Sequence, residues 1–133
     1  MSGADVFFDT NILLYLRSDE PAKLRRSEEI LDRGGVISVQ VLNEFANVAR
    51  RKYKLEWPAV RAFLTLFRAT LRVVPLTVET HARGIALSER YGFSVHDAMV
   101  VAAAELAGCK VLYTEDMHDG LVIGGLTLRN PYK

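Results

Sequence analysis

The stretch VFFDTN, Val6 to Asn11, places three apolar residues directly before a carboxylate. Val and Phe favour a buried strand, so Asp9 stands where that strand should end. Asp and Asn at such a place often form a turn or cap a helix, because their side chains bond nearby backbone amides. Whether Asp9 has a further role depends on whether other acidic residues occupy equivalent places in the chain.

Length and composition indicate a globular protein with one domain, residues 1–133. A chain of this size buries roughly two-thirds of the surface that its unfolded form exposes, so it needs no disulfide or structural metal to fold. Its 17 Lys and Arg residues nearly balance 16 Asp and Glu residues. The net charge of +1 therefore gives no evidence for a nucleic-acid partner. Cys109 is the only cysteine, which excludes an internal disulfide and a cysteine-rich zinc site.

The sequence also bears on cellular location. Residues 1–5 are too few and too polar for a signal peptide. The most apolar run, Ala98 to Ala107, is about half a membrane span and contains Glu105. We therefore expect a soluble, cytoplasmic protein without a membrane partner.

Strand-like and helix-like segments alternate along the chain. Apolar runs predict strands over 6–8, 36–38, 73–74 and 111–113, and two short strands within 121–128 joined at Gly124-Gly125. Helical spacing of apolar residues and terminal Pro, Gly and Ser residues predict helices from Asp19 as N-cap to about 33, and over about 39–52, 58–67, 78–90 and 95–106. This alternation predicts an α/β fold with a mainly parallel central sheet.

Four acidic residues occupy matching places in this pattern. Asp9 follows the first predicted strand and Asp116 the fourth, while Glu44 and Asp97 lie near the starts of two helices. Because ligands of open α/β sheets bind beyond the carboxyl ends of the strands, these acids can converge on one edge. Each also has a structural interpretation: Glu44 as an exposed helix charge, Asp97 as a capping-box acid three residues after Ser94, and Asp116 as a loop residue.

Four carboxylates at one edge would repel each other and raise each other's pKa, and a bound cation removes that cost. Oxygen ligands without a His or Cys pattern favour Mg²⁺ or Mn²⁺ over Zn²⁺. Such ions support hydrolysis of phosphodiester bonds. The sequence has no Gly-rich phosphate loop and no nucleophile elbow, which argues against nucleotide-driven and serine-hydrolase chemistry. His96 and His118 are the histidines that could lie near the acids.

Basic residues cluster after Glu44, at Arg50, Arg51 and Lys52, and again at 23–26. Cations near a helix C-terminus are favoured by the helix dipole and are usually solvated. The alternative is a rim around the acidic centre that contacts RNA phosphates.

Four segments resemble the PIN-domain nucleases, and most closely the VapC-type ribonuclease toxins of bacterial toxin–antitoxin pairs. They are FFDTNILLY, VLNEFANVARRK, VHDAMVVAAAELAGCKVLYTED and GLTLRNPY, and the resemblance extends over nearly the whole chain. It implies a three-layer α/β/α PIN fold with a central sheet of four or five strands. It further implies an endoribonuclease that uses Mg²⁺ or Mn²⁺, forms a homodimer and is blocked by a cognate antitoxin.

The resemblance also implies roles for individual residues. Asp9, Glu44, Asp97 and Asp116 match the acids that form the catalytic and metal-binding site. Asn11 matches the polar residue that supports the first acid, and Thr114 the small hydroxyl residue before the last. Where relatives have an aromatic residue, this chain reads TEDMHDG, so Asp119 competes with Asp116 for the fourth place, and we favour Asp116.

Two other functions are compatible with parts of the pattern. A small Mg²⁺-dependent phosphatase could use an Asp after the first strand as nucleophile, but that chemistry requires a second Asp two residues later, where this chain has Asn11. A PIN fold without activity could bind RNA or a protein, but this chain retains all four acids.

Overall fold

The computed structural model describes residues 2–133 and contains a six-stranded sheet in the order β3-β2-β1-β4-β6-β5. The strands are β1 (Val6–Phe8), β2 (Val36–Ser38), β3 (Arg72–Val74), β4 (Val111–Tyr113), β5 (Val122–Ile123) and β6 (Leu126–Arg129). Neighbouring strands are parallel except β5 and β6. The predicted α/β fold with a mainly parallel sheet is confirmed. The sheet has six strands rather than four or five, because the short β5–β6 hairpin adds one at the edge.

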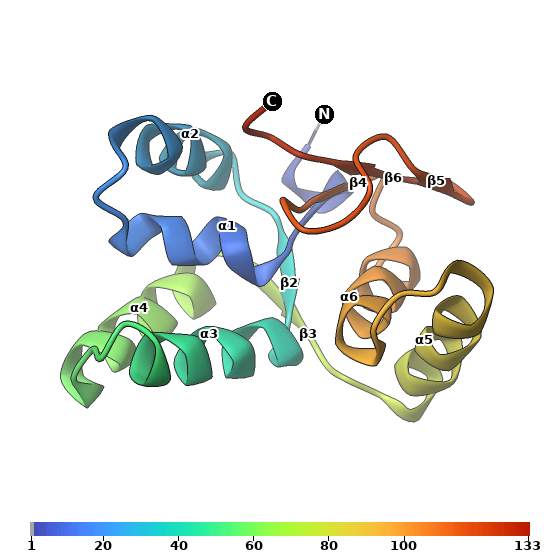
Figure 1. The fold of residues 1–133 in the computed structure, drawn as a ribbon, viewed down its shortest axis with the longest axis horizontal. Coiled ribbons are helices and arrows are strands. Elements are labelled where there is room, and N and C mark those ends of the chain that lie inside the picture. Colours follow the sequence, from blue (N-terminus) through green and yellow to red (C-terminus); the bar gives the residue numbers. More distant parts are fainter. Residues whose placement is uncertain (1) are drawn as a thin grey trace.

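Helices cover both faces of this sheet, with α5 and α6 together on one side and α1 to α4 on the other (Figure 1). The helices are α1 (Thr10–Leu14), α2 (Pro21–Asp32), α3 (Val39–Arg51), α4 (Trp57–Thr70), α5 (Val78–Tyr91) and α6 (Val95–Leu106), with short 3-10 helices η1 (Gly3–Asp5) and η2 (Tyr15–Arg17). The five predicted helices are present. The sequence analysis did not anticipate α1, and it was wrong about the N-cap of α2, which is Glu20 rather than Asp19. No helix in the part of the chain that the structure describes has the length and apolar character needed to span a bilayer.

The central strand β1 sets the position of the acidic edge. Phe7 pairs with Val36 of β2 on one side and with Leu112 of β4 on the other. Phe7 and Phe8 are fully buried, as expected for a central parallel strand with helices on both faces of the sheet. Because β1, β2 and β4 are parallel, their carboxyl ends lie together, and the residues that follow them share one edge of the sheet.

Two packing contacts hold the helices that reach this edge. In α6, residues 98–104 are buried around the whole helix, and Gly84 of α5 allows the close approach. A Cβ at Gly84 would lie 2.6 Å from the sulfur of Met99. In α3, Phe45 packs edge-on against Phe63 and Phe67 of α4, with ring centroids 5.5 and 4.9 Å away. Such pairs add about 0.5–1.5 kcal/mol each beyond their burial, and this packing fixes the turn of α3 that carries Glu44.

Candidate active site

Asp9 is both a helix cap and the most buried member of the acidic group. It is the N-cap of α1, and its carboxylate accepts a hydrogen bond from the Thr10 amide at 2.7 Å. The side chains of Thr114 and Asn11 also donate to it, at 2.8 and 3.3 Å. Only 3% of Asp9 is exposed. Burial raises the pKa of Asp9 from 3.8 to about 6, the hydrogen bonds from Thr114 and Thr10 oppose this rise, and the charges of Asp97 and Glu44 add to it.

Asn11 and Thr114 join Asp9 to Asp116. The Asn11 side chain donates to the Asp116 carboxylate at 3.0 Å. The Thr114 hydroxyl donates to Asp9 and also accepts a hydrogen bond from the Asp116 amide at 3.3 Å. These contacts bring the residue after β1 and the loop after β4 into one hydrogen-bonded group, with Asn11 and Thr114 as its links.

Glu44 reaches the same edge from the second turn of α3, where it forms an ion pair with Nε2 of His96. Burial alone would raise the pKa of Glu44, but the hydrogen bond and charge of His96 outweigh it and lower that pKa. In turn, the hydrogen bond to Glu44 raises the pKa of His96, against the opposing effect of burial. His96 therefore lies within the acidic group, as its position beside Asp97 had suggested.

Asp97 lies in the first turn of α6, where its amide nitrogen donates to the N-cap Ser94 side chain at 3.1 Å. Its structural interpretation as a residue near the helix cap is thus correct in part. Burial raises the pKa of the half-buried Asp97 carboxyl. The charge of His96 and a hydrogen bond with Ser94 oppose this rise, while Asp116 and Glu44 add to it. This mutual repulsion links all four acids at one edge of the sheet.

The donor set suits a divalent cation. Ligand atoms of Asp9, Glu44 and His96 lie within 4.8 Å of one another. Beside them, the buried hydroxyl oxygen of Thr10 makes no hydrogen bond of regular geometry among residues 2–133, although its proximity to Glu44 helps to lower the pKa of that carboxyl. Buried polar atoms without partners are rare in native proteins and often mark a site for an ion or water. Clustered carboxylates, of which Asp9 and Asp97 have raised pKa values, beside this buried oxygen are the environment that Mg²⁺ or Mn²⁺ would stabilise.

Comparisons with known proteins bear on this arrangement. A family model described as PIN domain matches residues 6–118. The chain belongs to the PIN domain family. The resemblance to PIN-domain nucleases is therefore confirmed. A comparison with curated protein sequences found no match.

Solved structures share the PIN fold. VapC20 of Mycobacterium tuberculosis, described as a Sarcin-Ricin loop cleaving toxin, is 19% identical with a TM-score of 0.70, over 84% of this chain and 89% of that one. A toxin–antitoxin complex from Klebsiella pneumoniae is 27% identical with a TM-score of 0.71, over 96% and 98%. VapBC2 from Rickettsia felis, bound to a DNA fragment from its promoter, is 22% identical with a TM-score of 0.68, over 94% and 97%.

Within this PIN domain, Asp119 serves a different purpose from Asp116. Its carboxylate accepts a hydrogen bond from the Asn130 amide at 2.8 Å, which ties its loop to the residue after β6. The structure describes no hydrogen bond between Asp119 and the acidic group. This geometry favours Asp116 as the fourth acid, whose role stays a prediction. His118 is exposed on the same loop.

One part of the site was not predicted from the sequence. The Glu115 carboxylate accepts hydrogen bonds from Lys23 at 2.6 Å and from the Tyr15 hydroxyl, and Lys23 also donates to that hydroxyl at 2.9 Å. The Glu115 amide donates to Asn11 at 3.2 Å. Burial alone would raise the pKa of Glu115, but the hydrogen bonds from Lys23 and Tyr15 lower it. Since Glu115 lies between Thr114 and Asp116, this network anchors the loop that carries the fourth acid.

The three residues of the predicted basic rim, Arg50, Arg51 and Lys52, do not line the same cavity. Arg50 donates to the Leu55 carbonyl at 3.0 Å, and its guanidinium lies 4.7 Å from the centre of the Trp57 ring. Arg50 and Arg51 line a shallow hollow with Trp57, whereas Lys52 lines a groove with Glu44 and Asp116. Of the three predicted RNA contacts, Lys52 alone shares a cavity with the acids.

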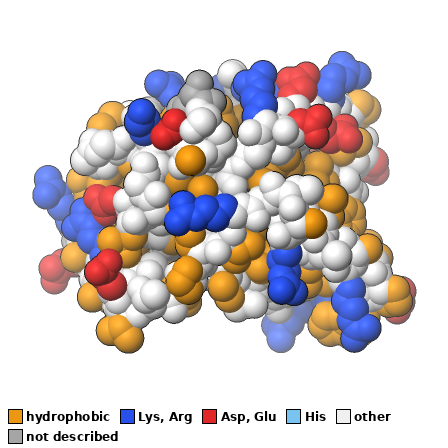
Figure 2. All heavy atoms as spheres, turned by 180° about the vertical axis from the view of Figure 1, so that it is seen from behind, with side chains coloured by type: hydrophobic (Ala, Val, Ile, Leu, Met, Phe, Trp, Pro, Cys, Tyr) orange, Lys and Arg blue, Asp and Glu red, His pale blue; other side chains and the backbone are white. Residues whose placement is uncertain are grey.

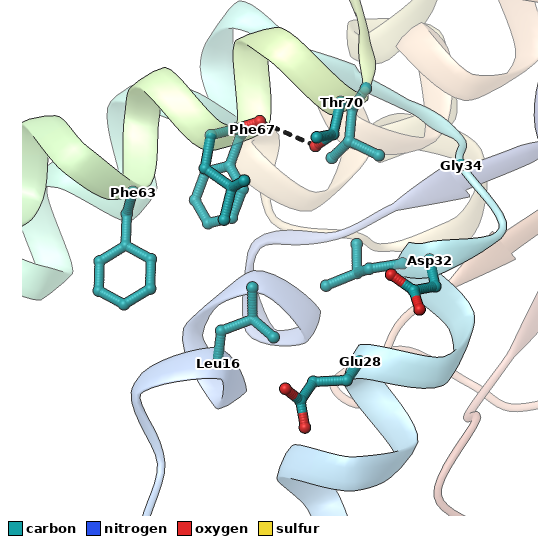
Figure 3. Close-up of a pocket in the computed structure, with 10 residues that line it drawn as sticks. Leu16, Glu28, Asp32, Gly34, Phe63, Phe67 and Thr70 are labelled. Atoms are coloured by element: carbon teal, nitrogen blue, oxygen red, sulfur yellow. Dashed lines mark hydrogen bonds between the residues drawn. The ribbon is translucent and has the colours of Figure 1, made fainter.

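Two hollows meet at η2. The acidic groove has a volume of about 390 Å³, and Tyr15 and Arg17 contribute to its wall. The second hollow, about 430 Å³, is mostly apolar and lies between η2, α2 and α4. Figure 3 shows Leu16, Phe63 and Phe67 around it, with the carboxylates of Glu28 and Asp32 on α2 nearby. The two hollows are thus neighbours separated by a single turn of chain.

Proposed function

We propose that this protein is an endoribonuclease that depends on Mg²⁺ or Mn²⁺. The observation that carries the proposal is the buried Asp9 carboxylate, with its pKa raised to about 6, beside Glu44, Asp97 and Asp116 at the carboxyl edge of the sheet. Negative charge gathered around a buried carboxylate is costly for a fold unless a cation neutralises it. PIN-domain membership and the fold shared with ribonuclease toxins support the same reading.

In this proposal Asp9 and Asp97 are the main metal ligands, while Glu44 and Asp116 hold a second ion or orient the attacking water. A bound divalent cation supplies positive charge that stabilises a phosphodiester under attack by water. Asn11 and Thr114 keep the Asp9 and Asp116 carboxylates in place through their hydrogen bonds. We expect in-line attack to leave a 5′-phosphate and a 3′-hydroxyl.

The biological role that we propose is that of a toxin in a toxin–antitoxin pair. The complex from Klebsiella pneumoniae aligns over nearly the full length of both chains, and the Rickettsia felis relative is a VapBC complex. We infer that the substrate is a structured RNA, that a cognate antitoxin blocks the acidic edge, and that the protein acts as a homodimer.

The phosphatase alternative is not supported by the hydrogen bonding. It needs a carboxylic acid at position 11, and there the Asn11 side chain instead bonds Asp9 and Asp116. An inactive RNA-binding PIN domain is separated from an enzyme by the cleavage experiment below.

The test is cleavage of total bacterial RNA, resolved on a denaturing gel, with Mg²⁺, Mn²⁺ or EDTA. We expect cutting with either ion and none with EDTA. Asp9→Asn and Asp97→Asn should each reduce the rate by at least about a hundredfold, because each removes a charge that holds the cation. Asp119→Asn is the matched control, since it removes an aspartate outside the acidic group, and it should cut normally. Full activity of folded Asp97→Asn would contradict the assignment.

A further inference from the structure

The acidic groove continues along α3 away from the acids. Glu44, Val48 and Lys52 all line it, and their spacing of four residues places them on one face of that helix. At 1.5 Å per residue, Lys52 lies about 12 Å along the axis from Glu44. The opposite wall comes from α1 and η2, through Asn11 and Arg17. An RNA strand at the acids would therefore pass cations as it followed this groove.

Arg17 is held in this groove on an aromatic ring. The carbon at the centre of its guanidinium lies 3.4 Å from the centre of the Tyr53 ring, a stacked contact that fixes a planar cation. Lys52 lies 5.4 Å from the same ring centre. Because Arg17 covers this face of Tyr53, that face cannot stack on a base. A ligand of Arg17 would therefore bind to the N–H groups at the edge of the guanidinium.

These N–H groups lack a partner in the protein. Nε of Arg17 is buried and makes no hydrogen bond within residues 2–133. No salt bridge in this part of the chain includes Arg17 or Lys52, although Glu20, Glu44, Glu115 and Asp116 line the same groove. A buried donor without a partner loses the free energy of a hydrogen bond unless a ligand supplies it.

The ligand that fits such a guanidinium is a phosphodiester. Its planar fork can donate two parallel hydrogen bonds to phosphate oxygens, and it is more weakly hydrated than an ammonium group. On the face seen in Figure 2, Lys and Arg side chains lie in several separate places among acidic and apolar ones. With a net charge of only +1, affinity for RNA has to come from local cations of this sort.

We propose that Arg17, stacked on Tyr53, forms with Lys52 a subsite that binds a phosphate of the RNA backbone farther along the acidic groove from the cleaved bond. That the ligand of this subsite is RNA rests on the proposed function. It assigns a role in substrate binding to Arg17 and Tyr53, and it assigns none to Arg50 or Arg51.

The experiment measures RNA binding without cleavage. The full chain is titrated into a 5′-fluorescein-labelled, single-stranded 12-nucleotide RNA of mixed sequence in EDTA, at 25 to 200 mM KCl, and anisotropy is recorded. A gel confirms that the probe is intact. Each phosphate contact on a single strand contributes about 0.7 to the slope of log affinity against log salt concentration.

Arg17→Met should bind roughly tenfold more weakly at the lowest salt, as expected for a lost charged hydrogen bond, and its slope should fall by about 0.7. Arg17→Lys should retain the slope but bind more weakly than the wild type, because the fork is lost. Tyr53→Leu should weaken binding, while Tyr53→Phe keeps the ring and should bind normally. Arg61→Met, which removes an exposed cation of α4, is the matched control and should match the wild type.

Equal slopes for Arg17→Met and Arg61→Met would overturn the subsite. Wild-type RNA affinity in Arg17→Lys would also overturn the subsite. This second variant keeps the test decisive if Arg17→Met does not fold. A loss of antitoxin affinity without a loss of RNA affinity in Arg17→Met would instead assign this surface to the protein partner. Because binding is measured in EDTA, its outcome is separate from the cleavage assay. The binding experiment can contradict the subsite while the cleavage assay supports the nuclease, and the cleavage assay can contradict the nuclease while the binding experiment supports the subsite.

Discussion

Glu44 of α3 and His96 of α6 meet inside the acidic group, as an ion pair when the imidazole is protonated, and Gln40 determines which ring nitrogen holds the proton when the imidazole is neutral. The Gln40 amide nitrogen donates to the His96 carbonyl oxygen at 3.1 Å and lies 2.8 Å from Nδ1 of the same residue. A side-chain amide nitrogen can only donate, so Nδ1 accepts and the ring proton resides on Nε2, facing Glu44. In this tautomer Nε2 has no lone pair for a metal. His96 is thus a partner that positions Glu44 rather than a ligand.

The first prediction is that His96→Leu binds Mn²⁺ at least as tightly as the wild type, because Glu44 no longer has a competing partner. The metal-free variant should lose about 1 kcal/mol of stability, the upper range for a partly exposed ion pair. Isothermal titration calorimetry gives the affinity and thermal melting in EDTA the stability. His81→Leu, at an exposed position of α5, is the control. Tenfold weaker Mn²⁺ binding in His96→Leu would show that the imidazole is a ligand after all.

The second prediction concerns the cost of the clustered acids. Burial raises the pKa of Asp97 above 3.8, so its ionised form at neutral pH destabilises the metal-free fold. Asp97→Asn should therefore melt at a higher temperature than the wild type in EDTA at pH 7. This gain should vanish below pH 3.8, where Asp97 is protonated in both the folded and the unfolded wild type.

With bound metal, the wild type should melt at a higher temperature than Asp97→Asn. An ion at a hundredfold excess over its Kd stabilises the wild type by about 2.7 kcal/mol, which is roughly 10 °C in Tm for a chain of this size. The melting temperature of Asp97→Asn should rise less on addition of metal. Identical melting of the wild type in EDTA and in millimolar Mn²⁺ would argue against the metal site.

The third prediction assigns a positioning role to Glu115. Glu115→Gln breaks the ion pair with Lys23 and should loosen the loop that holds Asp116, lowering kcat severalfold with little change in KM. Glu105→Gln is a matched control, because it breaks a similar pair, that of Glu105 with Arg83, also at 2.6 Å. Exposed pairs of this kind contribute about 0.2–1 kcal/mol, so both variants should have similar Tm values. Equal kcat values in the two variants would leave Glu115 with a structural role only.

Sequence reasoning found the acids and, through the resemblance, Asn11 and Thr114, which bond Asp9, but it did not find the contacts of Glu115 and Glu44. Asp9, Glu44, Asp97 and Asp116 follow from strand ends and helix starts, which are local features. Asp9 proved to be a helix cap as well, so its two readings were never exclusive. The helix it caps, α1, has five residues, too few for a helical period to stand out in the sequence.

The contacts that escaped prediction join residues distant in the chain. Glu115 with Lys23, and Glu44 with His96, are pairs whose proximity depends on how α2, α3 and α6 pack around the sheet. Periodicity says which face of a helix is buried, but not which polar side chains meet beyond its ends. The basic run 50–52 shows the same limit, because two residues of helix correspond to about 200° of rotation, which points Arg50 toward Trp57 and Lys52 into the acidic groove.

The last prediction concerns the antitoxin. An Arg of the antitoxin placed among the four acids would satisfy them as a cation does, because its fork bonds two carboxylate oxygens and stays charged. Antitoxin affinity should therefore fall as Mg²⁺ rises, and it should fall again in Asp97→Asn. The measurement is a titration of the cognate antitoxin against the wild type and Asp97→Asn, with and without Mg²⁺. Unchanged affinity in all four arms would mean that the inhibitor avoids the acidic edge.

The apolar hollow beside η2 (Figure 3) makes this prediction sharper. A chain that crosses η2 from the acidic groove enters this hollow, so an apolar segment of the antitoxin should fill it. Leu66 lines the hollow and is 48% exposed, and Ile85 on α5 is 44% exposed. Leu66→Glu should then weaken the antitoxin at least about tenfold, the order of the free energy of burying one leucine side chain, without slowing cleavage. Ile85→Glu should do neither, and equal losses in the two variants would exclude the hollow as the docking place.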